Sequence, residues 1–292
     1  MRVAQSETYR SFLGNLDTLN ERLNKLNSQV SSGKKLEQLK DSPASSAQLI
    51  GMRDQAAEID QYQSNIDSGS YFLGTADSIL NEVNNLVTSI YAKGSQSASE
   101  AVTADDRATI GTEIRSLRDQ IVALANTQVL GRYIFAGSRT NAAPFIVSGD
   151  AVAYQGDESV NKISIDRGLE VKEGIPGSAS FNSIFSAVDS LLTNLSANNL
   201  DGIKTVLGQF ASALSGLGIA RGEIGANLSL LNNAKTNLGS QETSLKAQQS
   251  QLEDANMAEA VTALSQVRTA LQTTMTAGGS ILQQRNLFDI LG

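Results

Sequence analysis

Apolar residues near the start of the chain recur at alternating intervals of four and three residues. The series is Phe12, Leu16, Leu19, Leu23, Leu26 and Val30. This spacing puts every member on one stripe of an α-helix and is typical of a helix that packs against another helix. The stripe stops at residues 31–33, where Gly33 favours the left-handed conformation that ends many helices.

A second, long helix is predicted to begin at Ser42 and Pro43, because Ser suits the N-cap and Pro the first helical position. The same alternation of apolar positions then continues from Ile59 to Ile90. Residues 93–100 are polar and rich in Gly and Ser, so we expect them to form a connection.

A third helix is predicted after Thr103, which can serve as an N-cap. Asp105 and Asp106 follow it, and acidic side chains stabilise the positive end of a helix. The apolar stripe of this helix consists of Ile110, Ile114, Leu117, Ile121 and Leu124.

The pattern changes at Gly131. Short runs of alternating apolar and polar residues now follow one another, separated by frequent glycines, at residues 133–135, 144–147, 152–154, 162–166 and 169–171. This arrangement predicts a small module of β-hairpins over about residues 131–180. Gly174, Pro176 and Gly177 close the module.

Helical spacing returns at about Ser183 and again near Leu200, where a long helix or a pair of helices is predicted. One heptad frame carries Ile224, Leu231, Leu238, Leu245 and Leu252. The final stripe runs from Met257 to Met275, before Gly278 and Gly279, and the chain ends in the apolar residues 287–292.

These patterns predict a mainly α protein with a small β domain. We expect an elongated helical bundle or coiled coil, built from the N- and C-terminal segments and interrupted by a β-hairpin module. The predicted segments are 1–42, an N-terminal coiled-coil segment that pairs with the C-terminus; 43–130 and 183–254, two parts of a helical rod; 131–182, the β module; and 255–292, a C-terminal coiled-coil segment.

The terminal stripes suggest assembly between copies. A single amphipathic helix cannot offset the entropy lost on ordering it, and neighbouring helices must cover its apolar face. We therefore predict that the terminal segments are mobile in the monomer and become ordered when subunits stack. The predicted interface residues are Phe12, Leu16, Leu19, Leu23, Leu26, Val30, Val261, Leu264, Val267, Leu271, Met275, Leu282, Leu287, Phe288, Ile290 and Leu291. The alternative is that the same stripes pack within an ordinary monomeric bundle, since heptads do not reveal whether the partner helix belongs to the same chain.

Composition narrows the function classes. The formal net charge is −7 and no basic run is longer than Lys34-Lys35, so nucleic acid is not an expected partner. The chain contains no Cys and no His, which excludes thiolate nucleophiles, Cys/His zinc sites and Ser-His-Asp triads. We find no stretch of about 18 apolar residues and expect no membrane insertion. The start lacks the apolar core of a cleavable signal peptide.

No motif predicts catalysis, a cofactor or a metal site. Asp105 and Asp106 read as helix-start acids rather than as a catalytic pair. Gly216, Gly218 and Gly222 do not match the dinucleotide-binding fingerprint, since Arg221 occupies the third glycine position and no strand precedes them. We therefore do not expect an enzyme.

The order of several short motifs resembles the flagellin superfamily along almost the whole chain. Residues 30–35 (VSSGKK) and 41–44 (DSPA) resemble the N-terminal signature of the superfamily. Residues 105–107 (DDR) and 117–120 (LRDQ) resemble its central helix, and residues 221–226 (RGEIGA) resemble the helix that returns after the β module. Residues 131–137 (GRYIFAG), 144–145, 154–158 (YQGDE) and 181–184 (FNSI) resemble the junction proteins of this superfamily rather than flagellins, which usually carry Asn-Gly at the first of these places. The chain also lacks the terminal Leu-Leu-Arg usual in flagellins.

This resemblance implies a structural subunit of the bacterial flagellum at the junction between hook and filament. It implies export without a cleavable signal by the flagellar type III apparatus and an extracellular location. The implied partners are hook-associated protein 1, flagellin, copies of the chain itself in a ring, and an export chaperone that holds residues 255–292. A short flagellin is the alternative within the superfamily, and a soluble helical-bundle binding module is the alternative outside it.

Overall fold

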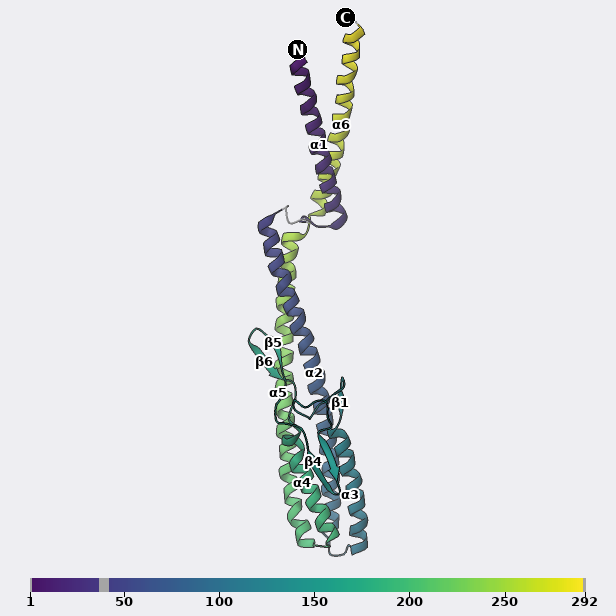
Figure 1. Ribbon diagram of the computed structural model, residues 1–292, viewed down its shortest axis with the longest axis vertical. Helices are drawn as coiled ribbons and strands as arrows, with labels where there is room; N and C mark the ends of the chain where they lie inside the picture. The colour runs from purple at the N-terminus through teal and green to yellow at the C-terminus, as the bar shows by residue number, and fades with distance from the viewer. Residues whose placement is uncertain (1, 37–41, 291–292) are drawn as a thin grey trace. The chain divides into compact units, whose positions relative to one another are not determined.

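The computed structural model describes the backbone of residues 2–36 and 42–290, and side chains within residues 7–36 and 42–280 except residue 8. The chain divides into two compact units (Figure 1). Unit 1 comprises residues 1–57 and 241–292, and unit 2 comprises residues 58–240. The predicted fold class is confirmed, because helices dominate and the strands form only small antiparallel hairpins.

The helices follow the predicted stripes. They are α1 (Arg2–Ser32), α2 (Pro43–Ser97), α3 (Ala104–Ala125), α4 (Gly177–Ser196), α5 (Leu200–Glu253) and α6 (Met257–Ile290). Gly33 follows α1 with a φ of 72°, as expected for a helix-ending glycine. Thr103 caps α3 in a capping box, in which its hydroxyl accepts a hydrogen bond from the backbone N–H of Asp106.

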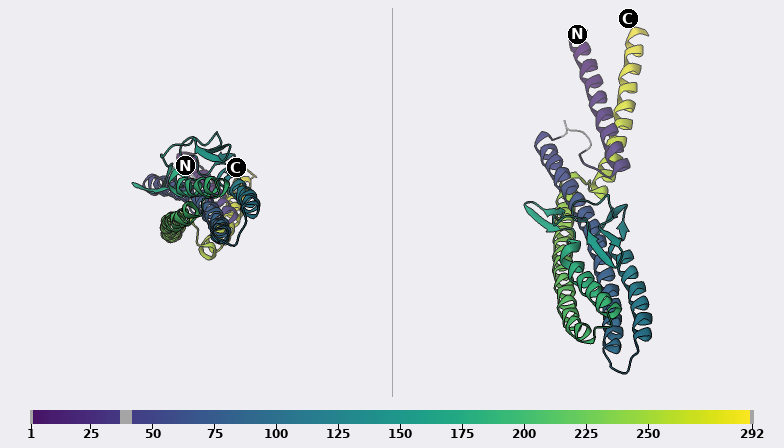
Figure 2. Two further views of the ribbon diagram at one scale, coloured as in Figure 1. Left: turned by 90° about the horizontal axis from the view of Figure 1, so that it is seen from below. Right: turned by 60° about the horizontal axis from the view of Figure 1, so that its bottom comes forward.

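Unit 2 contains a four-helix region formed by α3, α4 and the neighbouring parts of α2 and α5 (Figures 1 and 2). Each helix contributes fully buried apolar side chains to one core. They include Leu73, Leu80 and Ile90 of α2, Ile114 and Ile121 of α3, Ile184 and Leu191 of α4, and Phe210 of α5.

The connection predicted over residues 93–100 begins later than expected, since α2 continues to Ser97 and only residues 98–100 of that stretch lie outside a helix. Gly94 lies beneath Leu191 and Leu207, where a Cβ would approach their methyl groups to 3.1 and 3.0 Å. Ser97 is fully buried, and its hydroxyl donates to the carbonyl of Gly94 at 2.6 Å. The small residues therefore permit close helix packing instead of breaking the helix.

The β region consists of three separate two-stranded antiparallel sheets. The pairs are β1 (Gln128–Val129) with β2 (Arg132–Tyr133), β3 (Phe145–Ser148) with β4 (Ala151–Tyr154), and β5 (Lys162–Asp166) with β6 (Leu169–Lys172). The β3–β4 hairpin packs along α3 and α4, with Asp150 at its tip bound to Arg115 of α3. The β1–β2 and β5–β6 hairpins lie toward the end of the four-helix region opposite the two tight connections at residues 98–103 and 197–199 (Figure 2).

Two boundaries of this region differ from the prediction. The first strand begins at Gln128, before Gly131, and Phe135 is buried outside any strand. Helix α4 begins at Gly177 rather than near Ser183. The reason is an aromatic cluster, in which the ring of Phe181 packs edge-on against Phe135 and Phe145 at centroid distances of 4.9 and 5.3 Å. The first turns of α4 are needed to bring Phe181 into that cluster.

One sequence expectation about membranes needs correction. Helix α5 is long and apolar enough to cross a membrane by length and composition alone, whereas no such stretch was expected. Its apolar residues Ile203, Val206, Phe210 and Leu217 recur at helical intervals and are buried in unit 2. This periodic burial is typical of a core helix.

Candidate assembly interface

Helices α1 and α6 pack against each other in unit 1 (Figure 1). Near the chain ends, the ring of Phe12 on α1 contacts Gly278 on α6. Further along, the guanidinium of Arg268 donates to the side-chain oxygen of Asn27 at 3.2 Å. Residue numbers rise along α1 as they fall along α6, so the two terminal helices are antiparallel.

The predicted N-terminal stripe forms the α1 side of this contact. All six of its residues, from Phe12 to Val30, are only half-buried. The contacting face of α6 carries the buried residues Ala260, Leu264, Val267 and Gly278. Within this pair, α6 covers only part of each of the six side chains. The helix pair therefore leaves apolar surface in water on both flanks of the contact.

Not every predicted C-terminal residue lies on the contacting face. Leu264 and Val267 are buried and Leu271 is half-buried, but Val261 and Met275 are 49% and 54% exposed. These two residues lie at the edge of the contacting face and remain largely open to water in the single chain. The side chains of Leu282, Leu287, Phe288 and Ile290 lie outside the described residues, as does Leu291 altogether.

The C-terminal ends of α1 and α5 lie next to each other in unit 1. The backbone N–H of Lys35 donates to the carbonyl of Glu253 at 2.6 Å, and that of Ala255 donates to the carbonyl of Gly33 at 2.8 Å. The carboxylate of Glu253 also accepts from Lys34 at 2.6 Å and Arg53 at 2.9 Å. The end of α1, the start of α2 and the end of α5 are thus tied together around one carboxylate.

Helix α6 carries few charged residues on its surface. Between Glu259 and Arg285 its only charged residue is Arg268. The threonine hydroxyls on its surface donate to carbonyls one turn earlier, as Thr269 does to Ser265 and Thr273 to Thr269, at 3.0 and 2.9 Å. These threonines present methyl groups without an unpaired donor. Such a surface can be covered by another helix at little desolvation cost.

Sequence reasoning missed one feature of this surface and two exposed residues of unit 2. Gly278 follows Leu264 and Leu271 in the same seven-residue frame, which is the signal that places it in the contact. In unit 2, Leu130 and Ile219 are 79% and 72% exposed. Apolar identity alone gave no sign of that exposure.

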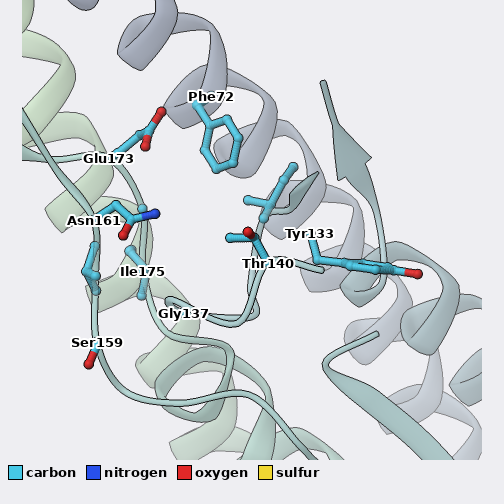
Figure 3. Close-up of a pocket in the computed structure, with 11 residues that line it drawn as sticks. Phe72, Tyr133, Gly137, Thr140, Ser159, Asn161, Glu173 and Ile175 are labelled. Carbon is cyan, nitrogen blue, oxygen red and sulfur yellow. The ribbon is translucent and has the colours of Figure 1, made fainter. Parts of the chain in front are cut away.

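Unit 2 also contains one small cleft between α2 and the segments that connect the hairpins (Figure 3). Its carboxylate, Glu173, accepts from Arg132 at 2.8 Å, and that guanidinium lies 4.9 Å from the centroid of the Phe72 ring. The hydroxyl of Tyr133 points away from the other labelled residues. The carboxylate is therefore already paired. Among the residues that the structure describes, no group of three acidic side chains is placed to hold a metal ion.

Comparison with known families identifies the class of protein. The profile of the bacterial flagellin N-terminal helical region matches residues 4–140, and that of the flagellin C-terminal helical region matches residues 207–291. Together the two profiles cover most of the chain, including α1 and α6. The chain belongs to the flagellin family, whose members are structural components of the flagellum.

Within that family, the chain is similar over its full length to flagellar hook-associated protein 3 of Salmonella typhimurium. The two are 25% identical, and the match covers 94% of this chain and 95% of the relative. The fold is shared with the solved FlgL of Xanthomonas campestris (TM-score 0.62, 21% identity, 68% of this chain and 99% of that one). It is also shared with flagellar hook associated protein-3 of Legionella pneumophila (TM-score 0.63, 15% identity, 69% of this chain and 98% of that one).

Proposed function

We propose that this chain is the structural subunit that joins the bacterial flagellar hook to the filament. The proposal rests above all on the antiparallel pair of terminal helices, whose apolar stripes are only half-covered within one chain. Such a pair gains stability when copies stack around it. The full-length similarity to a hook-associated protein supports the junction position in particular.

The partners follow from that position. One face of a ring of these chains contacts hook-associated protein 1, the other face contacts flagellin, and neighbouring copies contact one another within the ring. The interface comprises the predicted stripe residues of both terminal helices. Val261 and Met275, which this chain's own N-terminal helix leaves about half exposed, contact a neighbouring chain.

Export is the second part of the proposal. The chain leaves the cell through the flagellar type III apparatus, with an export chaperone holding residues 255–292 until secretion. The nearly uncharged surface of α6 supports this role, because such a helix exposed in the cytoplasm needs a protective partner. Co-purification of the chaperone with the full-length chain, but not with a chain that ends at residue 254, is the expected result.

We further propose that the chain has no catalytic role. The cleft of unit 2 offers one carboxylate, and Arg132 already pairs with it. A carboxylate held in this way is a poor general base.

A short flagellin is the second candidate. The chain is also 25% identical to a flagellin of Listeria innocua, over 91% of this chain and 89% of the relative. Immunogold labelling of intact flagella distinguishes the two. A junction subunit gives a single band where the hook meets the filament, whereas a flagellin labels the filament along its length. Absence of the label from flagella would instead favour a soluble binding module.

A further inference from the structure

The most exposed apolar side chains of the terminal helix pair gather on one of its two flanks. Arg268 of α6 donates to Asn27 of α1 at 3.2 Å, so the rows that contain these residues border the same flank. A helix returns to nearly the same side every seven residues. Val261 and Met275 lie seven residues to either side of Arg268, and Leu13 lies fourteen residues before Asn27. The exposed apolar residues of this Met275 flank are Tyr9, Leu13, Met257, Val261 and Met275.

The opposite side of α6 carries a shallow hollow. It is lined by Ser265, Gln266, Thr269, Ala270, Thr273 and Thr274. Gln266 precedes Met275 by nine residues, or about two and a half turns, so these two side chains leave α6 on opposite sides. We call the side of the hollow the Gln266 flank.

The hollow is suited to an apolar side chain. The hydroxyls of Thr273 and Thr274 donate to the carbonyls of Thr269 and Ala270 at 2.9 and 2.8 Å. Because these donors are already satisfied within α6, covering them breaks no hydrogen bond. An apolar side chain can therefore enter the hollow against threonine and alanine methyl groups.

The charges of α6 are divided between the same two flanks. Within residues 257–280 the charged residues are Glu259 and Arg268, and both are exposed. They too are nine residues apart, so Glu259 lies on the Gln266 flank and Arg268 on the Met275 flank. Neither forms an ion pair among the residues that the structure describes. The cation of one flank is thus complementary to the carboxylate of the other.

We propose that the Met275 flank of one copy packs against the Gln266 flank of the next copy. Arg268 then pairs with Glu259 of the next copy, and Met275 enters that copy's hollow at Gln266. A single offset of nine residues between two parallel α6 helices satisfies both contacts. This contact rests on the proposed function, which places copies side by side.

The opposite positions of the two flanks decide the kind of contact. Two different surfaces of one molecule make a head-to-tail contact, and such contacts close into rings or continue as helices. A contact between two Met275 flanks would use neither Glu259 nor the hollow, and it would bring the Arg268 cations toward each other.

Because the natural chain contains no cysteine, the contact can be tested by site-specific cross-linking. Chains with Met275→Cys and chains with Gln266→Cys are produced separately and together in the same cells, and isolated flagella are oxidised. We expect a cross-linked dimer only when both variants are present. The control replaces Gln266→Cys by Gln272→Cys, an exposed glutamine three residues from Met275 and on the same side of α6. Equal dimer yields from the two mixtures would overturn the contact.

The arms of this experiment separate the contact from the function. If the chains are present at the hook–filament boundary but Met275→Cys and Gln266→Cys give no dimer, the contact is wrong and the junction role stands. If the chains are absent from flagella, the proposed function itself fails, and the contact fails with it.

A charge exchange tests the ion pair. Arg268→Glu alone and Glu259→Arg alone should each increase filament shedding several-fold, because like charges then meet between copies. The chain with both changes should return shedding to the natural level, since the pair is restored with its signs exchanged. If Arg268 serves only Asn27 of its own chain, the second change cannot restore attachment. Shedding from the doubly changed chain as high as from the single variants would overturn the ion pair, as would single variants that shed no filaments.

Discussion

The ring of Phe12 on α1 lies against the bare backbone of Gly278 on α6, in the space that a side chain at residue 278 would occupy. The ring can approach so closely only because glycine has no Cβ. Gly278 takes the next place in the seven-residue frame of Leu264 and Leu271. This contact fixes the pairing of the two ends of the chain.

The first prediction follows from that contact. Gly278→Ala should separate the terminal helices near their ends, because a methyl group would overlap the aromatic ring. We expect faster amide exchange in the first half of α1 and increased filament shedding.

The adjacent glycine provides the control. Gly279 has open space around its Cβ position, so Gly279→Ala should raise the helix propensity of α6 by about 1 kcal/mol without disturbing the contact. Equal amide exchange in the two variants would show that Phe12 does not depend on Gly278.

A charge in the N-terminal stripe should prevent assembly without unfolding unit 2. Leu23 is half-buried, and Leu23→Asp places a carboxylate against α6 at a cost of about 1–3 kcal/mol. We expect motility to fall and filaments to be shed, with the thermal transition of unit 2 unchanged. Asn24→Asp adds the same charge on the exposed side of α1, and normal motility is expected there. Unshed filaments in Leu23→Asp cells would argue against the stripe as an interface.

Arg107 should be the most sensitive charged residue of unit 2. It is buried and donates to the carbonyls of Ser97 and Ser99 and to the side chain of Asn198, at 3.0, 2.8 and 2.7 Å. It thus joins the two tight connections at one end of the four-helix region. Arg107→Ala should lower the free energy of unfolding by about 2–4 kcal/mol, since buried acceptors lose a charged donor. Denaturant unfolding measures this change.

The matched control for Arg107 is a second arginine. Arg139→Ala removes an exposed side chain and should cost less than about 0.5 kcal/mol. Similar losses in the two variants would mean that the bonds of Arg107 add little to stability.

Acid should weaken the attachment of the β3–β4 hairpin to α3. The hydrogen bond from Arg115, aided by the charges of Arg115 and Arg118, lowers the pKa of Asp150. A lowered pKa means that the folded chain binds this proton less readily than the unfolded chain. The stabilisation is therefore present above the unfolded value of about 3.9 and is lost as the pH falls through the folded pKa.

This pH dependence can be checked with Asp150→Asn. The pair is partly exposed, so the loss at pH 7 should be below about 1 kcal/mol. Stability should then fall less steeply below about pH 4 than in the natural chain. If the free energy of unfolding fell identically with acid in the two proteins, Asp150 would not contribute to the acid sensitivity of the fold.

Much of the fold follows from periodicity along the chain. The spacing from Phe12 to Val30 marks one face of α1, and the frame from Ile224 to Leu252 marks one face of α5, because a helix returns to the same side every seven residues. Turn residues likewise predict local hairpins. They do not reveal that the hairpins remain three separate sheets, since that depends on contacts with the helices.

The periodicity of the sequence predicts only part of the candidate interface. Glycine in a sequence usually predicts the end of a helix. Gly94 and Gly278 nevertheless lie inside helices, where large side chains pack onto them. Leucine and isoleucine are read as core, yet Leu130 and Ile219 are exposed. Both errors arise because packing between distant segments, rather than local preference, decides what a small or an apolar residue does.

The most direct test of the junction role is deletion of the gene, followed by electron microscopy of the cells and analysis of the culture medium. The proposed function predicts hooks without filaments, together with unpolymerised flagellin in the medium. Intact filaments on the deletion strain would contradict it.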